Sequence, residues 1–420
     1  MKYENEYIKI LEEELKPAMG CTEPIAIAYA ASIAKKYLNA PITKADIYVS
    51  GNIVKNVKSV IVPNTNGLRG IEAACAIGLI AGKSDLELEC ISKVNQDEIE
   101  KCKELLLKKI IKKDLSESDY IFDIHLFAYS NDNVCEVRIV DYHTNVVLVR
   151  YNNEVIIKKE IVGTKKSDLT DRSLLNVEDI YNFALNVDIN KIKGILDYQI
   201  KCNMEIAIEG LNNDYGANVG KTILKHESES IKTKAKAYAA AGSDARMNGC
   251  NMPVVINSGS GNQGMTCSLP VIIYADELGV GYEKKIRALA LSNLLTTHIK
   301  TDIGRLSAYC GAVAAGCAAG AAISYLYGGD LKVVSHTLVN ALAIASGVIC
   351  DGAKASCAAK IAIAVDSGIL GYHMYLSGNQ FKGGDGIVKK GVENTIHNVG
   401  QLASLGMVET DKEIIKIMME

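Results

Sequence analysis

A run of small and apolar residues between positions 306 and 328 constrains the fold of this chain more than any other stretch. The run holds no charged side chain, and Ala and Gly make up about half of it. Its length approaches that of a membrane span, but Ala and Gly are weakly hydrophobic, which favours a helix buried inside a protein. The chain also has 35 Gly, no Trp and 4 Phe, a composition suited to helices packed closely around small side chains. We therefore predict a mainly helical fold with this segment at its centre.

The composition limits the classes of function. The 420 residues are 48% hydrophobic, which is enough for two or three domains with sizeable cores. A net charge of −3 and a pI near 6.2 argue against nucleic acid or an anionic membrane as a partner. The first residues lack the basic and then apolar order of a signal peptide, so we expect a cytoplasmic protein. In that reducing compartment the 12 cysteines are expected to be metal ligands, catalytic groups or core residues, and not disulfides.

Hydrophobic periodicity predicts the elements of the first 113 residues. Helical patterns occupy 7–15, 24–37 and 70–81, and a strongly charged helix is predicted at 95–113. Two short strands are predicted between them, at 46–50 and 57–62.

The pattern then changes to β-rich runs and changes back. Four strands are predicted at 120–129, 134–142, 146–151 and 155–162, with a hairpin turn at Asn152 and Asn153. From residue 167 onward the pattern is almost wholly helical. We therefore predict a mainly α fold with an inserted α+β unit: a discontinuous helical catalytic body at 1–83 and 167–420, and a small α+β domain at 84–166.

Three cysteines are candidate metal ligands. Cys350 and Cys357 flank a predicted break after an apolar helix, and Cys310 lies forty positions before Cys350. Three thiolates can hold three irons of a four-iron cluster and leave the fourth iron open as a Lewis acid. The spacing is not that of a zinc ribbon, and buried small hydrophobic residues remain the alternative. We interpret Cys317, which repeats the same gap after Cys310, as a core residue.

Cys21 is a candidate for proton transfer. It stands immediately before a predicted helix with Thr22 as a cap and Pro24 in the first turn. The aligned amides of a helix start stabilise a thiolate, so we expect the pKa of Cys21 to fall toward neutrality. That property suits a general base or a metal ligand, and a half-buried structural thiol is the alternative.

A Gly-rich segment at 257–264 is a candidate for anion binding. Its backbone amides and the side chains of Ser258, Ser260, Asn262 and Gln263 offer donors for a carboxylate. The glycine spacing fits neither a Walker A loop nor a dinucleotide fingerprint. A second loop at 63–67, which contains Asn64, offers similar donors, although many such loops are only turns. No lysine stands out as a pyridoxal phosphate site.

Five separated motifs resemble those of the iron–sulfur L-cysteine desulfidases, and the similarity extends over almost the whole chain. They are Gly20-Cys21-Thr22-Glu23-Pro24, Ser243-Asp244-Ala245-Arg246-Met247, Asn257 to Gly264, Arg305 to Cys310, and Cys350-Asp351-Gly352-Ala353-Lys354. The tail from Val392 to Met407 is similar too. A more distant resemblance is to the α-chain region of iron–sulfur L-serine dehydratases, where one cluster cysteine precedes a small-residue helix and two more follow.

The resemblance implies a fold like that of the L-serine dehydratase α-chain and an oxygen-sensitive carbon–sulfur lyase. The implied reaction is β-elimination of L-cysteine to hydrogen sulfide, ammonia and pyruvate on a [4Fe-4S] cluster, without pyridoxal phosphate. Cys310, Cys350 and Cys357 are the implied ligands, because this set leaves Cys21 for proton transfer. Cys21, Cys310 and Cys350 form a competing set.

Other readings stay open at this point. L-serine dehydration on the same cluster is the nearest alternative, and a non-catalytic iron–sulfur sensor is the second. The substrate is expected to be a small amino acid, with no nucleic acid or membrane partner, and a homo-oligomer is compatible with the sequence. The sequence does not decide whether Glu23, Asp351 and Lys354 act directly or in support.

Overall fold

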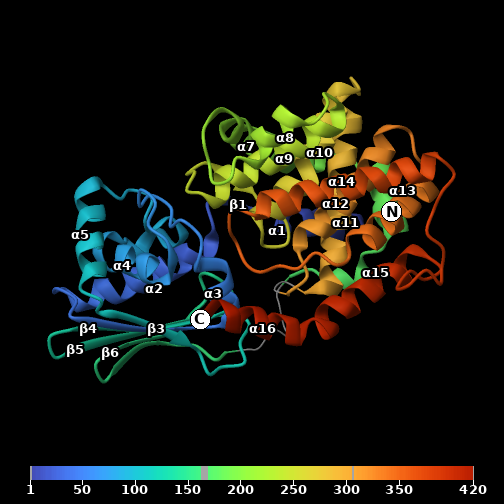
Figure 1. Cartoon of the computed structure of the whole chain (residues 1–420). Coiled ribbons are helices and arrows are strands. Elements are labelled where there is room, and N and C mark those ends of the chain that lie inside the picture. Colours follow the sequence, from blue (N-terminus) through green and yellow to red (C-terminus); the bar gives the residue numbers. More distant parts are fainter. Residues whose placement is uncertain (1, 162–168, 305–306, 420) are drawn as a thin grey trace.

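The computed structural model describes residues 2–161, 169–304 and 307–419. Within these ranges the chain forms a helical body and a six-stranded sheet with helices packed on one face (Figure 1). Three residues of predicted features lie outside the described residues. They are Val162 of the predicted strand 155–162, Arg305 of the motif that ends at Cys310, and Leu306 at the start of the apolar run. The predicted boundary between residues 166 and 167 also lies outside them.

The helical body contains the N-terminal helix and the helices that follow residue 176. They are α1 (Glu4–Glu14), α6 (Val177–Asn186), α7 (Lys193–Asn212), α8 (Val219–His226), α9 (Ile231–Met247), α10 (Gly261–Glu277), α11 (Tyr282–Ile303), α12 (Gly311–Leu326), α13 (Leu331–Ala345), α14 (Cys357–Leu376) and α15 (Val392–Gln401).

Helix α12 forms the centre of this body, because α10, α11, α13 and α14 all pack against it. A Cβ atom added to Gly320 of α12 would lie 2.3 Å from the carbonyl oxygen of Gly368 in α14, so only glycine permits this approach. Residues 312–326 are all buried, which confirms the prediction of a buried central helix. No helix within the described residues combines the length and the apolar character that a bilayer span requires.

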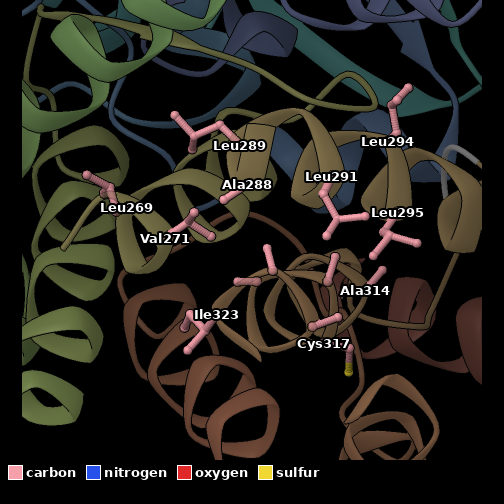
Figure 2. Packing of buried hydrophobic residues seen from close by; sticks show 14 of the residues in the cluster. Leu269, Val271, Ala288, Leu289, Leu291, Leu294, Leu295, Ala314, Cys317 and Ile323 are labelled. Atoms are coloured by element: carbon pink, nitrogen blue, oxygen red, sulfur yellow. The ribbon is translucent and has the colours of Figure 1, made fainter. Parts of the chain in front are cut away.

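Larger aliphatic side chains fill the space between the central helices. Figure 2 shows Leu269 of α10 and Leu291 and Leu295 of α11 on the side of α12 that carries Ala314. Cys317 belongs to the same hydrophobic cluster and is fully buried. Its interpretation as a core residue is therefore confirmed.

The sheet has the strand order β3-β2-β4-β5-β6-β7. Its strands are β2 (Lys44–Val49), β3 (Ile111–Leu115), β4 (Asp123–Ser130), β5 (Asn133–Val140), β6 (Val146–Tyr151) and β7 (Glu154–Lys158). Strand β2 runs parallel to β3, and every other neighbouring pair is antiparallel. The hairpin turn predicted at Asn152 is confirmed, since this residue has a φ of +52° between the paired strands β6 and β7.

Helices α2 (Thr22–Leu38), α4 (Gly70–Ala81) and α5 (Gln96–Leu107) accompany the sheet, and the predictions for this region need two corrections. Residues 57–62 do not form a strand, because α3 (Gly51–Val57) ends there in a turn. The charged helix stops at Leu107 and not at residue 113. Lys109 adopts a φ of +53°, and Ile111 then pairs with Ala45 as the start of β3.

The hydrophobic cores divide the chain at points other than the predicted boundary after residue 83. One cluster joins residues 25–81 with residues 90–149, and the other joins residues 7–15 with residues 175–403. The first cluster crosses the predicted boundary because β2 lies between β3 and β4 in the sheet. Helices α2 and α4 also contact strands of that sheet. Residues 25–81 therefore share their core with the sheet.

Two connections bring these parts together. Strand β1 (Pro17–Met19) pairs antiparallel with β8 (Pro253–Val255), so the start of α2 lies beside the segment that leads into α10. The C-terminal helix α16 (Val408–Met419) packs on α3, where Lys55 forms an ion pair with Asp411 (Figure 1). The starts of α2 and α10 and helix α3, which these connections position, line the cavity described next.

Candidate active site

A cavity of about 130 Å³ lies between the helical body and the segment 21–56. Every predicted site residue except Asn64 lines it, and several further polar residues join them. Its lining includes Cys21, Glu23, Lys55, Asn56, Arg246, Ser258, Ser260, Asn262, Gln263, Lys300, Tyr309, Cys310, Cys350 and Cys357. Residues more than 300 positions apart in sequence thus share one site.

Backbone pairing places Cys310 beside Cys350. Tyr309 and Ile349 form an antiparallel bridge, and the Cys310 amide donates to the carbonyl of Val348 at 3.1 Å. Cys310 and Cys350 follow the bridged residues directly, so the pairing holds these two cysteines together at the cavity.

Cys357 reaches the same cavity as the first residue of α14. Its thiol donates to the carbonyl oxygen of Gly352 at 3.5 Å, which folds the 350–357 loop back on itself. A Cβ atom on Gly352 would lie 1.9 Å from the carbonyl oxygen of Lys55, and its φ is +94°. Only glycine allows this loop to touch α3 so closely.

Four helices begin at the cavity. Cys21 precedes α2, Ser260 precedes α10, Cys310 precedes α12 and Cys357 starts α14. The first amides of a helix lack partners inside the helix and carry the positive end of its dipole. Their convergence favours negative charge in the cavity, as a carboxylate or a set of thiolates would supply.

Burial and neighbouring charges act on the clustered thiols. Burial and the neighbouring Cys350 raise the pKa of Cys310 to about 12, and burial also raises the pKa of Cys357. Cys310, Cys350 and Cys357 act on one another electrostatically, whereas Glu23 and Arg246 are the charges that act on Cys21. Such thiols release their protons when a cation binds them.

The placement of the three thiols around one cavity is compatible with the ligands of a four-iron cluster. Among the described residues, no three His, Cys, Asp or Glu side chains are grouped closely enough to hold one metal ion. A cluster presents each thiolate with a different iron, so its ligands need to surround a space and not to meet at a point. Cys310, Cys350 and Cys357 line such a space from two segments, the residue before α12 and the 350–357 loop.

The pKa expectation for Cys21 is wrong. The thiol is buried and donates to Glu23 Oε2 at 3.1 Å. Burial and the negative charge of Glu23 raise its pKa well above the usual value, although Arg246 lowers it. Desolvation and a nearby carboxylate thus outweigh the helix amides, and Cys21 keeps its proton.

Glu23 is a site residue that the motif alone did not identify as one. Its Oε2 accepts the Cys21 thiol, and its Oε1 accepts the Asn56 amide at 3.3 Å. In sequence, a glutamate in the first turn of a helix has an ordinary role as a partner of the helix dipole. Only the position of Asn56, from α3, reveals the second contact.

The Gly-rich segment forms a tight turn that leads into a helix start. Asn257 and Ser260 exchange both backbone hydrogen bonds across Ser258 and Gly259, whose φ values are +49° and +76°. The backbone amides of Asn257 and Ser260 are therefore not free donors, which corrects the expectation of a continuous anion nest. Ser260 Oγ accepts from the Gln263 amide at 3.4 Å and caps α10.

Arg246 provides the positive charge for this side of the cavity, and its motif alone did not single it out. Its side chain is 5% exposed, and its Nη1 donates to Asn262 Oδ1 at 3.3 Å. Its Nε has no partner among the described residues, and neither do Gln263 Oε1 and the Tyr309 hydroxyl. A buried polar atom without a partner costs about 1–3 kcal/mol, so these three atoms indicate a place for a bound polar molecule.

Lys300 adds a second buried cation. It is 5% exposed and donates to the carbonyl of Gly304, and burial lowers its pKa to about 8. The charges of Cys350 and Cys310 raise that pKa in turn, so this lysine offsets negative charge on the thiols.

Asn64 does not line the cavity. Its side-chain amide donates to the carbonyl of Ile91 at 3.1 Å, and its backbone amide donates to Asn251 Oδ1 at 3.4 Å. With a φ of +59°, Asn64 supports the turn that it occupies. These contacts agree with the alternative that the loop at 63–67 is only a turn.

Comparison with known proteins gives the family. The family described as "Serine dehydratase alpha chain" matches residues 85–416. A UPF0597 protein of Desulfitobacterium hafniense is 56% identical over 418 residues, covering 100% of this chain and 97% of the relative. UPF0597 proteins of Finegoldia magna and Treponema denticola are 48% and 46% identical, covering 99% of this chain in both cases and 99% and 97% of the relatives.

The family match includes the three clustered thiols and Arg246, whereas Cys21, Glu23 and Asn56 precede its first matched residue. The relatives extend over both segments. The chain therefore belongs to the serine dehydratase α-chain family, among the UPF0597 proteins.

Proposed function

We propose that this protein is an L-cysteine desulfidase that eliminates hydrogen sulfide from L-cysteine and yields ammonia and pyruvate. The observation that carries the proposal is the shared cavity, in which three thiols face the helix starts, Arg246 and the Cys21–Glu23 pair. Cys310, Cys350 and Cys357 would hold a [4Fe-4S] cluster. When bound, the cluster would supply an open iron as a Lewis acid toward the β-substituent of the substrate.

The substrate carboxylate is bound near the start of α10. Arg246 supplies a buried guanidinium with a free Nε, and the side-chain amides of Asn262 and Gln263 supply further donors. Charge-assisted hydrogen bonds of this kind are short and directional, so they orient the α-carbon as well as binding the molecule.

The Cys21–Glu23 pair moves the α-proton. Glu23 is the acceptor, because Cys21 is protonated and already donates to it. The Cα–H bond breaks and its proton goes to the Glu23 carboxylate, either directly or by transfer through the Cys21 sulfur. The Cα–H electron pair forms the Cα=Cβ bond, and the Cβ–S bond breaks with its electron pair leaving on sulfur.

The remaining steps need no further group from the protein. The elimination product is 2-aminoacrylate, which tautomerises to an imine, and water hydrolyses the imine to pyruvate and ammonia. No electrons are gained or lost overall.

The proposal is tested by sulfide and pyruvate release from L-cysteine by anaerobically purified, iron-reconstituted protein. Equal amounts of both products, lost on exposure to air, are expected. Neither product from protein that holds about four irons per chain would favour the non-catalytic cluster protein.

L-Serine dehydration is the second candidate, because the matching family is described as a serine dehydratase α-chain. The same residues would act, with a hydroxyl leaving as water. Measuring kcat/KM for L-cysteine and L-serine in parallel separates the two. A higher value for L-serine would replace the desulfidase assignment.

A further inference from the structure

A second cavity lies in the helical body, on the side away from the sheet. It measures about 490 Å³ and is formed by the first half of α13, the loop 380–391 and the start of α15 (Figure 1). None of its lining residues belongs to the candidate active site. Its volume falls in the range of about 300–1,000 Å³ that is usual for pockets binding small molecules.

The lining of this cavity is strongly basic. Lys332, Lys382, Lys389 and Lys390 contribute four ammonium groups, and no Asp or Glu is among its described lining residues. None of the four forms an ion pair among the described residues. All four side chains are exposed, so solvent screens part of their mutual repulsion, and an anion in the cavity would relieve the rest.

The nearby carboxylates are engaged elsewhere. Asp330 caps α13 by accepting from the Val333 amide at 3.0 Å. Asp385 accepts from the backbone amide of Lys382 at 2.6 Å, and Glu393 bonds the Val177 amide and His298, both at 2.7 Å. These bonds hold the carboxylates at backbone amides and at His298, so they leave the four lysines without an acidic partner.

The backbone adds to the same field. Helix α15 begins at the cavity, with Gly391 as its cap and no side chain bonded to its first amides. Lys389 and Lys390 stand directly before that positive helix end. A helix start and two adjacent cations together suit a phosphate group.

The lining also includes apolar residues. Val339 and Val388 are buried, and Phe381 and Val392 are half-buried. The His336 ring is stacked on Tyr375 with centroids 5.1 Å apart, and burial and Lys332 lower its pKa. This surface suits the non-ionic portion of an organic anion.

We propose that this cavity binds a small molecule that carries two or more phosphate groups, with a nucleotide as the form that fits both the basic and the apolar residues of the lining. The phosphates contact the lysines and the start of α15. The base and sugar contact Phe381 and the two buried valines.

The probes are ATP and inorganic triphosphate, each measured by equilibrium dialysis against the full chain at physiological salt. We expect one ATP per chain and weaker binding of triphosphate. The double variant Lys389→Gln/Lys390→Gln is expected to weaken ATP binding about 10-fold or more. Phe381→Ala should weaken ATP binding while leaving triphosphate unchanged.

The matched control is Lys225→Gln, an exposed lysine in α8 outside this cavity, which should bind ATP as the unmodified protein does. Thermal unfolding of each variant shows that it is folded. Absence of saturable binding of either probe, or unchanged binding in the double variant, would overturn the proposal. Equal affinity for the two probes, unaffected by Phe381→Ala, would overturn the nucleotide and leave inorganic polyphosphate as the ligand.

Discussion

Cys310 and Cys21 occupy the same local position in the two regions that meet at the cavity. Each stands immediately before an Ala-rich helix, α12 in the helical body and α2 beside the sheet. Their neighbours differ, because Cys310 faces two further thiols while Cys21 faces the Glu23 carboxylate. The comparison teaches that a helix start does not decide the chemistry of a cysteine. Residues delivered from distant segments decide it.

The largest expected effect is on the three clustered thiols. Replacing Cys310, Cys350 or Cys357 by Ala should remove the cluster and reduce activity to background, because each thiol would bind a different iron. Cluster absorbance of anaerobically purified protein is the measurement. Cys317→Ala, in the helix that follows Cys310 and inside the core, is the matched control and should retain cluster and turnover. Loss of the cluster in the control would contradict the distinction.

The next effect concerns the proton pair. Glu23→Gln and Cys21→Ser should each lower turnover about 10²–10⁴-fold, the usual contribution of a positioned acid or base. Exchange of the substrate α-proton with deuterated water reports this step separately from sulfide release. Glu89→Gln, an exposed glutamate outside the cavity, is the control. Normal exchange in Glu23→Gln would show that another group accepts the proton.

A smaller effect is expected at Arg246. Arg246→Lys keeps the charge but loses the fork of donors, so KM for L-cysteine should rise about 10- to 100-fold with a smaller change in kcat. Steady-state kinetics with a circular dichroism check measures this. An unchanged KM would mean that the free Nε does not bind the carboxylate.

The smallest effect concerns the contact that joins the two regions. Asp411→Asn in α16 leaves the buried Lys55 ammonium without its partner and should lower the free energy of unfolding by about 1–3 kcal/mol. Denaturant unfolding measures it. Glu409→Gln on the same helix breaks an exposed pair with Lys412 and should change that free energy by less than about 0.5 kcal/mol. Equal effects of the two substitutions would show that the buried pair does not hold α16 in place.

Local sequence predicted much of the helical body and part of the site. The run of Ala and Gly around Cys317 indicated a central helix, because a single uncharged segment of small side chains is enough to predict close packing with other helices. The Gly-rich turn and the three thiols were likewise identified from nearby residues, and the structure brings them to one cavity.

Long-range contacts account for what the sequence did not predict. Strand β2 lies between β3 and β4, so the core that residues 25–81 share with the sheet could not be assigned from their helical pattern. The pKa of Cys21 depends on burial, and the second contact of Glu23 comes from Asn56 in another helix. Asn64 has the same residue type and loop setting as a binding residue, but its hydrogen bonds go to Ile91 and Asn251, outside the cavity.

The most direct test of the division between the two regions is the iron content of Cys21→Ser and Cys357→Ala, purified side by side without air. We predict about four irons per chain and a pyruvate release lowered about 10²–10⁴-fold for Cys21→Ser, and loss of iron for Cys357→Ala. Iron retained by Cys357→Ala and lost by Cys21→Ser would contradict the assignment, since Cys21 would then be the third ligand.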